Sequence, residues 1–519
     1  MSASRYDCIV IGAGHNGLTC AAYLARAGRS VLVLEAGDGP GGAACTREFA
    51  PGFRVSGCAH LLHLMPGWLR EELRLDAHGL ALAAEGMPTI ALSTAGALRI
   101  PGPGSVALQD LSAADARAFP PYAARMRRLA GALRPLLEAV PPRLGSGAWR
   151  DRLALLKLGA RLRLLGRADM RELLRIAGMC VHDLLDEHFE SPLLKGALAF
   201  DAVLGTNLGP RSPGTVFTLL YRLAAAGGTG SLAQPVGGLG ALTNAIAAAA
   251  TDAGAVIRFG TPVARVMVKE DSAAGVVLQS GERLEADCVV SSADPRTTFL
   301  GLLGAEHLDA GFVRRVAHLR TLGMTAKLHL ALGRMPRFTA LADGAPAGRL
   351  VLAPSAEAVE RAFNDAKYGQ FSAAPLLEVI VPTAVDPSLA PPGEHVLSAV
   401  VQYAPYKLAG GWEGQRERFL EVILQTLEAQ APGLRDSVRA AELLTPPDIE
   451  AQFRISGGNW HHVELALDQF FMVRPVAGAA QYRAPLRGLF LCGAGCHPGG
   501  GVMGIPGRNA ARQILAQAA

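Results

Sequence analysis

The chain has 519 residues, of which half are hydrophobic and 18% are charged, and its formal net charge is +5. This length and a mean hydropathy of +0.24 indicate two or three domains with a large core, and they exclude extensive disorder. The small net charge gives no sign of nucleic-acid binding, and no motif that reads RNA or DNA is present. Eight scattered cysteines without a C-x-x-C pair predict neither a disulfide framework nor a metal site, and they fit a reducing compartment.

The first predicted elements form a βαβ unit. Residues 6–11, YDCIVI, are short, apolar and β-branched, which is typical of a buried parallel strand. Residues 15–27 predict a helix that ends at Gly28, and SVLVLEA predicts the second strand. No signal peptide is expected before a strand that starts near Tyr6, and no apolar run is long enough to span a bilayer. We therefore expect a cytoplasmic protein, or one that lies on a membrane surface.

A G-x-G-x-x-G motif stands between this strand and this helix. Gly12 permits the tight turn, Gly14 lets the backbone approach a pyrophosphate, and Gly17 lets the helix pack on the strand. Free N–H groups at the helix start, around His15 and Asn16, favour negative charge. Because the strand, loop and helix occur in the right order, the motif predicts a dinucleotide site.

The residues after the second strand indicate which dinucleotide is bound. Glu35, followed by Ala36, can accept hydrogen bonds from both ribose hydroxyls and would repel a 2′-phosphate, which disfavours NADP. A second glycine pair, Gly41 and Gly42, follows at once and is itself followed by Ala43. A second close approach of the backbone suits the long, extended FAD better than NAD.

The middle of the chain is predicted to be mainly helical from about residue 68 to 230. Within it, residues 143–175 are strongly basic and interleaved with leucine. Such a stretch could lie on anionic lipid and admit an apolar substrate, or it could be a solvated helix face. Residues 255–291 alternate apolar and polar side chains and predict hairpins that end in a buried strand. Residues 488–518 predict a strand, a glycine loop and a helix.

Two segments resemble known flavoproteins. GAGHNGLTCAAYLARAGRSVLVLEAGDGPGGAACT resembles the FAD-binding start of phytoene desaturase-like and amine-oxidase-like proteins, and LFLCGAGCHPGGGVMGIPGRNAARQIL is similar to the closing segment of carotenoid desaturases and ketolases. The resemblance implies FAD, and an α/β fold in which a Rossmann-type FAD-binding domain of the glutathione-reductase or amine-oxidase type carries an inserted α+β substrate domain. It implies contacts to the flavin or its adenosine from Val263, Gly493, Gly500, Gly501, Val502 and Met503.

A third segment, GGNWHHVELALDQFFMVRP at 457–475, resembles the branch that contains pyridine nucleotide-disulfide oxidoreductase domain-containing protein 2 and ketolase-type carotenoid enzymes. The matching positions are His462, Asp468, Gln469 and Arg474. True phytoene desaturases tend to carry an aspartate in the stretch that reads GFRVSGCAH here, where this chain has Ser56. The resemblance therefore does not make phytoene the expected substrate.

The order of these segments predicts a discontinuous cofactor domain. We assign residues 1–70, 231–298 and 481–519 to it, and 71–230 and 299–480 to a substrate domain whose part at about 110–230 is mainly helical. No apolar strand is predicted before Gly237, so a second nucleotide fingerprint is not expected there. The backbone N–H groups of residues 500–503, at the start of the last helix, would stabilise a reduced flavin, unless the loop is only a glycine-rich helix entry.

These features predict a phytoene dehydrogenase-like oxidoreductase that passes a hydride from a hydrophobic, polyene-like or lipidic substrate to FAD, with oxygen or a quinone as the final acceptor. His462 and His497 are the favoured acid–base residues among five histidines that include His60, His63 and His461, although a structural role is open for each. Arg474 could orient an anionic substrate or bond the flavin. The alternatives are a flavoprotein that acts mainly through protein partners, and a dithiol oxidoreductase that uses Cys492 and Cys496.

Overall fold

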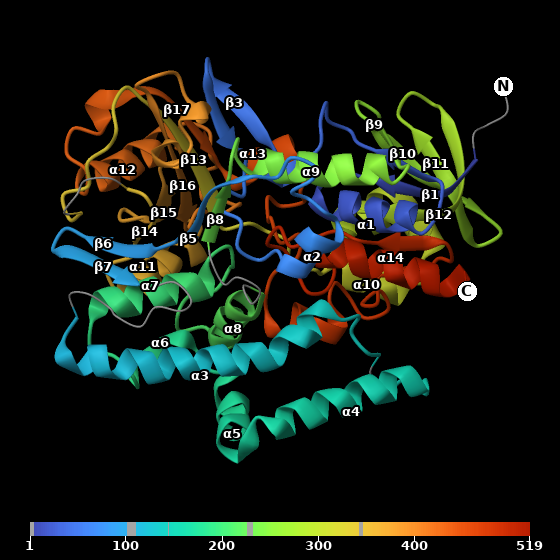
Figure 1. The fold of residues 1–519 in the computed structure, drawn as a ribbon, viewed down its shortest axis with the longest axis horizontal. Helices are drawn as coiled ribbons and strands as arrows, with labels where there is room; N and C mark the ends of the chain where they lie inside the picture. Colours follow the sequence, from blue (N-terminus) through green and yellow to red (C-terminus); the bar gives the residue numbers. More distant parts are fainter. Residues whose placement is uncertain (1–4, 101–110, 144, 226–231, 342–345, 519) are drawn as a thin grey trace.

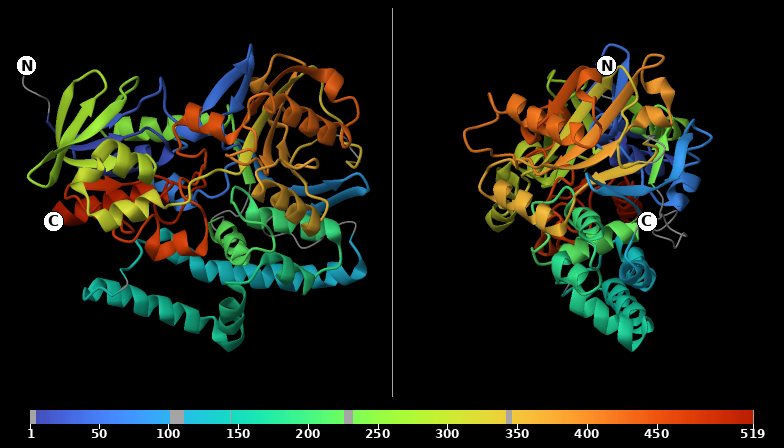
Figure 2. Two further views of the ribbon diagram at one scale, coloured as in Figure 1. Left: turned by 180° about the vertical axis from the view of Figure 1, so that it is seen from behind. Right: turned by 90° about the vertical axis from the view of Figure 1, so that its left-hand side faces the viewer.

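The computed structural model describes residues 5–100, 111–143, 145–225, 232–341 and 346–518. Figure 1 shows two sheets side by side, with a layer of helices beneath them. Both views of Figure 2 agree that this helical layer lies on one side of the molecule. Among the described residues no helix is both long enough and apolar enough to cross a membrane.

The first sheet is built around the predicted βαβ unit. Its order is β10-β11-β12-β1-β2-β9, and β18 adds to β12 in parallel. The strands β1, β2, β9, β12 and β18 run parallel, so their carboxyl ends lie at one edge, which is where ligands bind in such sheets. The strand bounds are β1 Arg5–Ile11, β2 Val31–Leu34, β9 Val256–Arg258, β10 Val263–Lys269, β11 Ser272–Leu278, β12 Arg283–Ser291 and β18 Leu489–Leu491.

Three helices from distant parts of the sequence pack together beside this sheet. The first of them, α1, contacts both of the others, and small buried residues on it allow the close approach. The bounds are α1 His15–Arg26, α9 Leu239–Asp252 and α14 Ile505–Ala518. Their N-termini follow the loops that carry the glycine motifs.

The second sheet is mixed, in the order β17-β13-β16-β15-β14-β6-β7. Phe419, Ile423 and Leu427 of α12 are fully buried and form one apolar cluster with residues of these strands. The bounds are β6 Thr89–Ser93, β7 Gly96–Ile100, β13 Thr325–Leu332, β14 Arg349–Leu352, β15 Leu376–Ile380, β16 His395–Gln402, β17 Val438–Leu444, α11 Ala356–Lys367, α12 Arg416–Glu428 and α13 Pro446–Phe453.

The helical layer has its own apolar core, in which α3, α6, α7 and α8 pack together. By contrast, α4 has no buried residue and lies at the lower edge of the molecule in Figure 1. The helices of this layer are α3 Ala113–Glu138, α4 Trp149–Leu164, α5 Gly166–Ile176, α6 Val181–Asp186, α7 Pro192–Val203 and α8 Thr215–Ala225. Two further helices, α2 Gly67–Glu72 and α10 Ala310–Ala317, pack with the core of the first sheet. Two hairpin-like pairs complete the fold: β3 Thr46–Ala50 with β4 Phe53–Ser56, and β5 Leu82–Met87 with β8 Leu232–Pro235.

The predicted elements at both ends and at 255–291 are confirmed, and α1 is followed by Gly28 at φ +81°. The expectation of a mainly helical stretch from residue 68 is wrong for 82–100, because the alternating and β-branched residues there form β5, β6 and β7. The expectation that no strand precedes Gly237 is also wrong. That strand, β8, pairs antiparallel with β5 outside the first sheet, so it does not form a second βαβ unit.

Candidate functional site

The two predicted glycine segments lie beside each other at the carboxyl edge of the first sheet. A Cβ on Gly17 would lie 2.1 Å from the carbonyl oxygen of Gly12, so only glycine lets α1 approach the first turn this closely. Gly12 has φ +94°, and a Cβ on Gly14 would have only the Ser292 hydroxyl within 4 Å. Gly41 donates its N–H to the carbonyl oxygen of Ala13 at 2.9 Å. Both segments therefore present backbone to the same groove.

Polar groups that lack a protein partner line this groove. Nε2 of His15 and Oδ1 of Asn16 are buried and have no hydrogen-bond partner within the described part of the chain. Glu35 directly follows β2, and its carboxylate accepts from the N–H groups of Ala13 at 2.6 Å and Gly37 at 2.8 Å. The carboxylate is thereby held at the loop, where the sequence places the ribose. Ala36 continues the turn that leads to the second glycine pair.

The C-terminal loop enters the same region from the other side. Gly493 follows β18, and a Cβ there would lie 2.4 Å from the carbonyl oxygen of Ser292. The N–H groups of residues 500–503 have no hydrogen-bond acceptor among the described residues. The Tyr221 hydroxyl donates to the carbonyl oxygen of Gly500 at 2.7 Å, which holds the loop against α8. The helix itself begins at Ile505, so these N–H groups precede the first helical residue.

Behind these loops lies a cavity that is open to solvent at its mouth. Its wall includes His15, Ala43, Gly501 and Val502 from the cofactor loops, and the aliphatic part includes Leu61, Leu64, Leu204, Val400 and Leu465. Met503 is fully buried in the helical core beside it. The lining also includes charged and aromatic side chains: Asp201, Tyr221, Arg222, Arg349, Glu378, Trp460, His60, His63 and His461.

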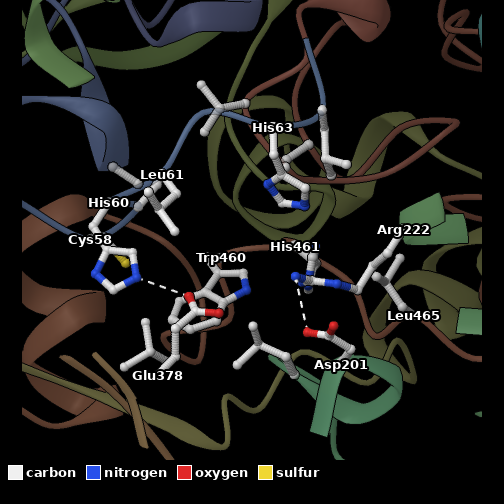
Figure 3. A pocket seen from close by; sticks show the side chains of 18 of the residues that line it. Cys58, His60, Leu61, His63, Asp201, Arg222, Glu378, Trp460, His461 and Leu465 are labelled. Atoms are coloured by element: carbon white, nitrogen blue, oxygen red, sulfur yellow. Dashed lines mark hydrogen bonds and ion pairs between the residues drawn. The ribbon is translucent and has the colours of Figure 1, made fainter. Parts of the chain in front are cut away.

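A chain of buried charges forms one end of this cavity (Figure 3). Arg349 bonds both carboxylates, Glu378 through Nε and Asp201 through a terminal nitrogen. Glu378 also accepts from Nε2 of His60 at 2.9 Å, while Arg222 approaches Asp201 at 3.6 Å. Because Arg349, with His60, holds the Glu378 carboxylate, the pKa of that group lies well below its usual range despite burial.

The favoured acid–base histidines do not line the cavity in the described part of the chain. Nε2 of His497 donates to the carbonyl oxygen of Leu136 at 2.8 Å, and burial lowers its pKa to about 4. His462 has φ +63° and lies near His15 and Gly495, on the cofactor side. Their catalytic role stays a prediction, and the cavity instead contains His60, His63 and His461.

Arg474 has a structural position. It is fully buried, and its guanidinium group donates to six backbone carbonyls, those of His461, Val463, Glu464, Gln469, Ala494 and Cys496. It therefore ties the segment around 461–469 to the loop after β18. The other two matching positions serve the same segment: Asp468 pairs with Arg320 at 2.6 Å, and Gln469 accepts from the N–H of Arg320 at 3.0 Å. None of these three lines the cavity as described.

Four other residues singled out in the sequence also have clear surroundings. Ser56 accepts from the N–H of Leu239 at 3.0 Å, at the start of α9. Val263 opens β10 and faces Leu278 of β11. Cys492 and Cys496 are both buried and not disulfide-bonded, and burial raises the pKa of the Cys496 thiol to about 12. A thiol with so high a pKa is a poor nucleophile, which argues against the dithiol alternative.

The family described as Flavin containing amine oxidoreductase matches residues 17–515. The chain is 40% identical over 545 residues to pyridine nucleotide-disulfide oxidoreductase domain-containing protein 2 of Mus musculus, across 98% of this chain and 93% of that protein. It is 27% identical to the lycopene-forming phytoene desaturase of a Paracoccus species, across 99% and 98% of the two chains. The solved structure of putrescine oxidase bound to putrescine has the same fold, with TM-score 0.61 at 16% identity over 99% of each chain.

The chain therefore belongs to the flavin-containing amine oxidoreductase family. It is an FAD-dependent oxidoreductase, and its cofactor is FAD. The residues present fit that group: the glycine segments lack side chains where a pyrophosphate would approach, His15 and Asn16 have unpartnered polar atoms, and residues 500–503 offer free N–H groups. Which of the individually predicted residues touch FAD stays a prediction.

The charged end of the cavity was missed by the sequence analysis. Its members lie on elements that carry no recognised motif: Asp201 on α7, Arg222 on α8, Arg349 on β14 and Glu378 on β15. A signal was nevertheless present, because LLEVI and RLVL are apolar strands that each contain one ionisable residue. Such a residue is rarely buried without a partner, so each of these strands predicts an ion pair.

Proposed function

We propose that the protein dehydrogenates a largely apolar substrate bound in the cavity beside residues 500–503, and that oxygen or a quinone takes the electrons. The observation that carries this proposal is that residues of the cofactor loops and leucine and valine side chains line the same cavity. FAD, held by the two glycine segments and by residues 500–503, would supply the hydride acceptor. The similarity to a phytoene desaturase, which by its name acts on a polyene, supports an apolar substrate.

The residues of the cavity would exclude water and orient the substrate. The leucine and valine side chains of the lining desolvate an apolar chain, which favours its transfer from water. His63 and His461 are neutral because burial lowers the pKa of each well below its usual value. Nε2 of His63 and Nδ1 of His461 have no partner among the described groups, so each can bond the substrate or take a proton. They are better placed for this than His462 or His497.

The test is anaerobic reduction of the bound flavin by a panel of geraniol, geranate, retinol, phytoene and limonene, measured as the loss of the flavin absorption band. Rapid bleaching by at least one lipid supports the proposed enzyme. No bleaching across the panel, with a protein that still holds its flavin, would favour the alternative of a flavoprotein that acts mainly through partners.

A second proposal concerns the surface, where we infer that α4 lies on anionic lipid. The helix exposes Trp149, Leu153, Leu156 and Leu164, with exposed fractions between 38% and 85%. These positions are spaced by four, three and eight residues, so they share one outward stripe. Exposed cations lie on the same helix, namely Arg150, Arg152, Lys157, Arg161 and Arg163, and the exposed Arg167 follows at the start of α5. An apolar stripe beside cations is the pattern of an interfacial helix.

A further inference from the structure

We infer that the substrate carries an anionic group, and that Arg222 with the two imidazoles of His63 and His461 binds it at the charged end of the cavity. The inference rests on the proposed function and narrows its substrate class from any apolar molecule to an apolar chain with a carboxylate. Figure 3 shows the guanidinium group of Arg222 reaching into the cavity between His63 and Asp201.

Among the charged residues at this end of the cavity, Arg222 has the fewest bonded partners within the described part of the chain. Glu378 and Asp201 are both bonded by Arg349, and Glu378 has His60 as a second donor. Arg222 has one ion pair within the described residues, to Asp201, at the long distance of 3.6 Å. A guanidinium group has five N–H donors and stays protonated, so most of its donors remain available to a ligand.

His63 and His461 each contribute a ring nitrogen without a hydrogen-bond partner in the described part of the chain at this end of the cavity. His461 is 8% exposed, and its Nδ1 has no hydrogen-bond partner in the described chain, as is true of Nε2 of His63. The Arg222 charge contributes to the lowered pKa of both histidines, which places all three groups within electrostatic reach of one another. A carboxylate accepts two or more hydrogen bonds, so one carboxylate could accept from Arg222 and from the N–H groups of His63 and His461 at once.

The charges also argue against a cationic ligand. Two guanidinium groups, those of Arg222 and Arg349, face this end of the cavity, and Lys327 lies behind His60 at 2.5 Å. The two carboxylates that could attract a cation are engaged by Arg349. An amine placed here would be repelled by the charge of Arg222, while the carboxylates beside it already form ion pairs with Arg349. Leucine and valine side chains supply apolar lining in the same cavity, so the cavity suits an amphiphile with a negative head.

The experiment uses three probes with one tail: geranate, geraniol and geranylamine. Their binding to the holoenzyme is followed as a change in the visible spectrum of the bound FAD, which requires no turnover. We expect geranate to bind best. Arg222→Met should lower the affinity for geranate by about tenfold or more and change the affinity for geraniol by less than about twofold. Arg222→Lys should keep part of the preference, and Arg314→Met, on an exposed face of α10, should keep all of it.

Two outcomes would overturn the inference. One is wild-type protein that binds geraniol or geranylamine as tightly as geranate, a result that does not depend on any variant folding. The other is a geranate preference that survives in Arg222→Met. Failure of the proposed function would look different, because the flavin would resist reduction by lipids whatever the order of binding.

Discussion

Lys327 donates a hydrogen bond to Nδ1 of His60 at 2.5 Å, directly behind the wall of the cavity. This contact fixes the tautomer of His60, so its other nitrogen carries the proton and donates to Glu378 at 2.9 Å. Both ring nitrogens of His60 are therefore hydrogen-bonded. Burial and the Lys327 charge lower the pKa of His60 to about 4, so the imidazole is uncharged at neutral pH. Burial lowers the pKa of Lys327 itself to about 7.

The first prediction follows from the low pKa of Lys327. A base whose pKa is lowered on folding makes the protein more stable as pH rises from about 7 toward its unfolded value of 10.5. Lys327→Met should lack this gain, so its free energy of unfolding relative to wild type should fall by about 4 kcal/mol between pH 6 and pH 10. In the folded protein His60, with a pKa of about 4, and Cys58, with a pKa of about 12, do not titrate in that window, and their titration in the unfolded chain is common to wild type and variant.

Thermal unfolding at several pH values measures this difference. Lys407→Met is the matched control, because that lysine is exposed and should leave the pH profile unchanged. Parallel profiles for Lys327→Met and wild type between pH 6 and pH 10 would show that Lys327 is charged throughout.

The second prediction concerns the glycine groove. Gly17→Ala places a Cβ 2.1 Å from the carbonyl oxygen of Gly12, so α1 must move away from β1. We expect the affinity for FAD to fall by about tenfold or more, as measured by the flavin-to-protein ratio after dialysis. Gly39→Ala is the control, because nothing lies within 4 Å of a Cβ at that glycine and its backbone is not strained. Full flavin content in Gly17→Ala would contradict the predicted site.

The third prediction concerns Arg474 as a structural residue. Arg474→Met removes the donor from six carbonyls at once, and we expect a loss on the order of 3 kcal/mol or more in the free energy of unfolding. Lysine has too few donors to replace it, so Arg474→Lys should rescue little. Arg320→Met breaks an exposed ion pair instead and should cost less than about 1 kcal/mol. Similar chemical denaturation curves for both methionine variants would rule out the structural role.

The fourth prediction concerns α4. Wild-type protein should co-sediment with vesicles rich in phosphatidylserine, and less with neutral vesicles, because cations beside an apolar stripe favour an anionic surface. Changing Arg161, Arg163 and Arg167 to glutamate should abolish most of the binding. The same change at Arg314 and Arg315, on α10, should not. Vesicle binding that is unchanged when Arg161, Arg163 and Arg167 are replaced would end the proposal.

The sequence predicted the cofactor side of this protein well, because its features are local. A strand, a glycine turn and a helix within 30 residues require each other sterically, and Gly17 shows this at a single contact. The charged end of the cavity depends instead on residues separated by up to about 180 positions along the chain, such as Asp201 and Glu378. No local pattern encodes their meeting, since two sheets and the helical layer must first pack.

The histidines show the same limit. His497 and His462 were favoured for their positions in motifs, yet His497 is used to bond a carbonyl of α3, which is remote in sequence. His63 and His461 face the cavity because of how the loops that carry them are held, and Arg474 holds one of these loops. Motif position therefore located the region of the site and not the orientation of its side chains.

The most direct test of the account is a crystal structure of the protein purified with its FAD. We predict that the pyrophosphate lies over Gly14, that Glu35 bonds the ribose, and that the flavin ring lies against the N–H groups of residues 500–503 at the mouth of the cavity. A flavin ring bound away from that loop, with the cavity of Arg222 and His461 closed off from it, would contradict the account.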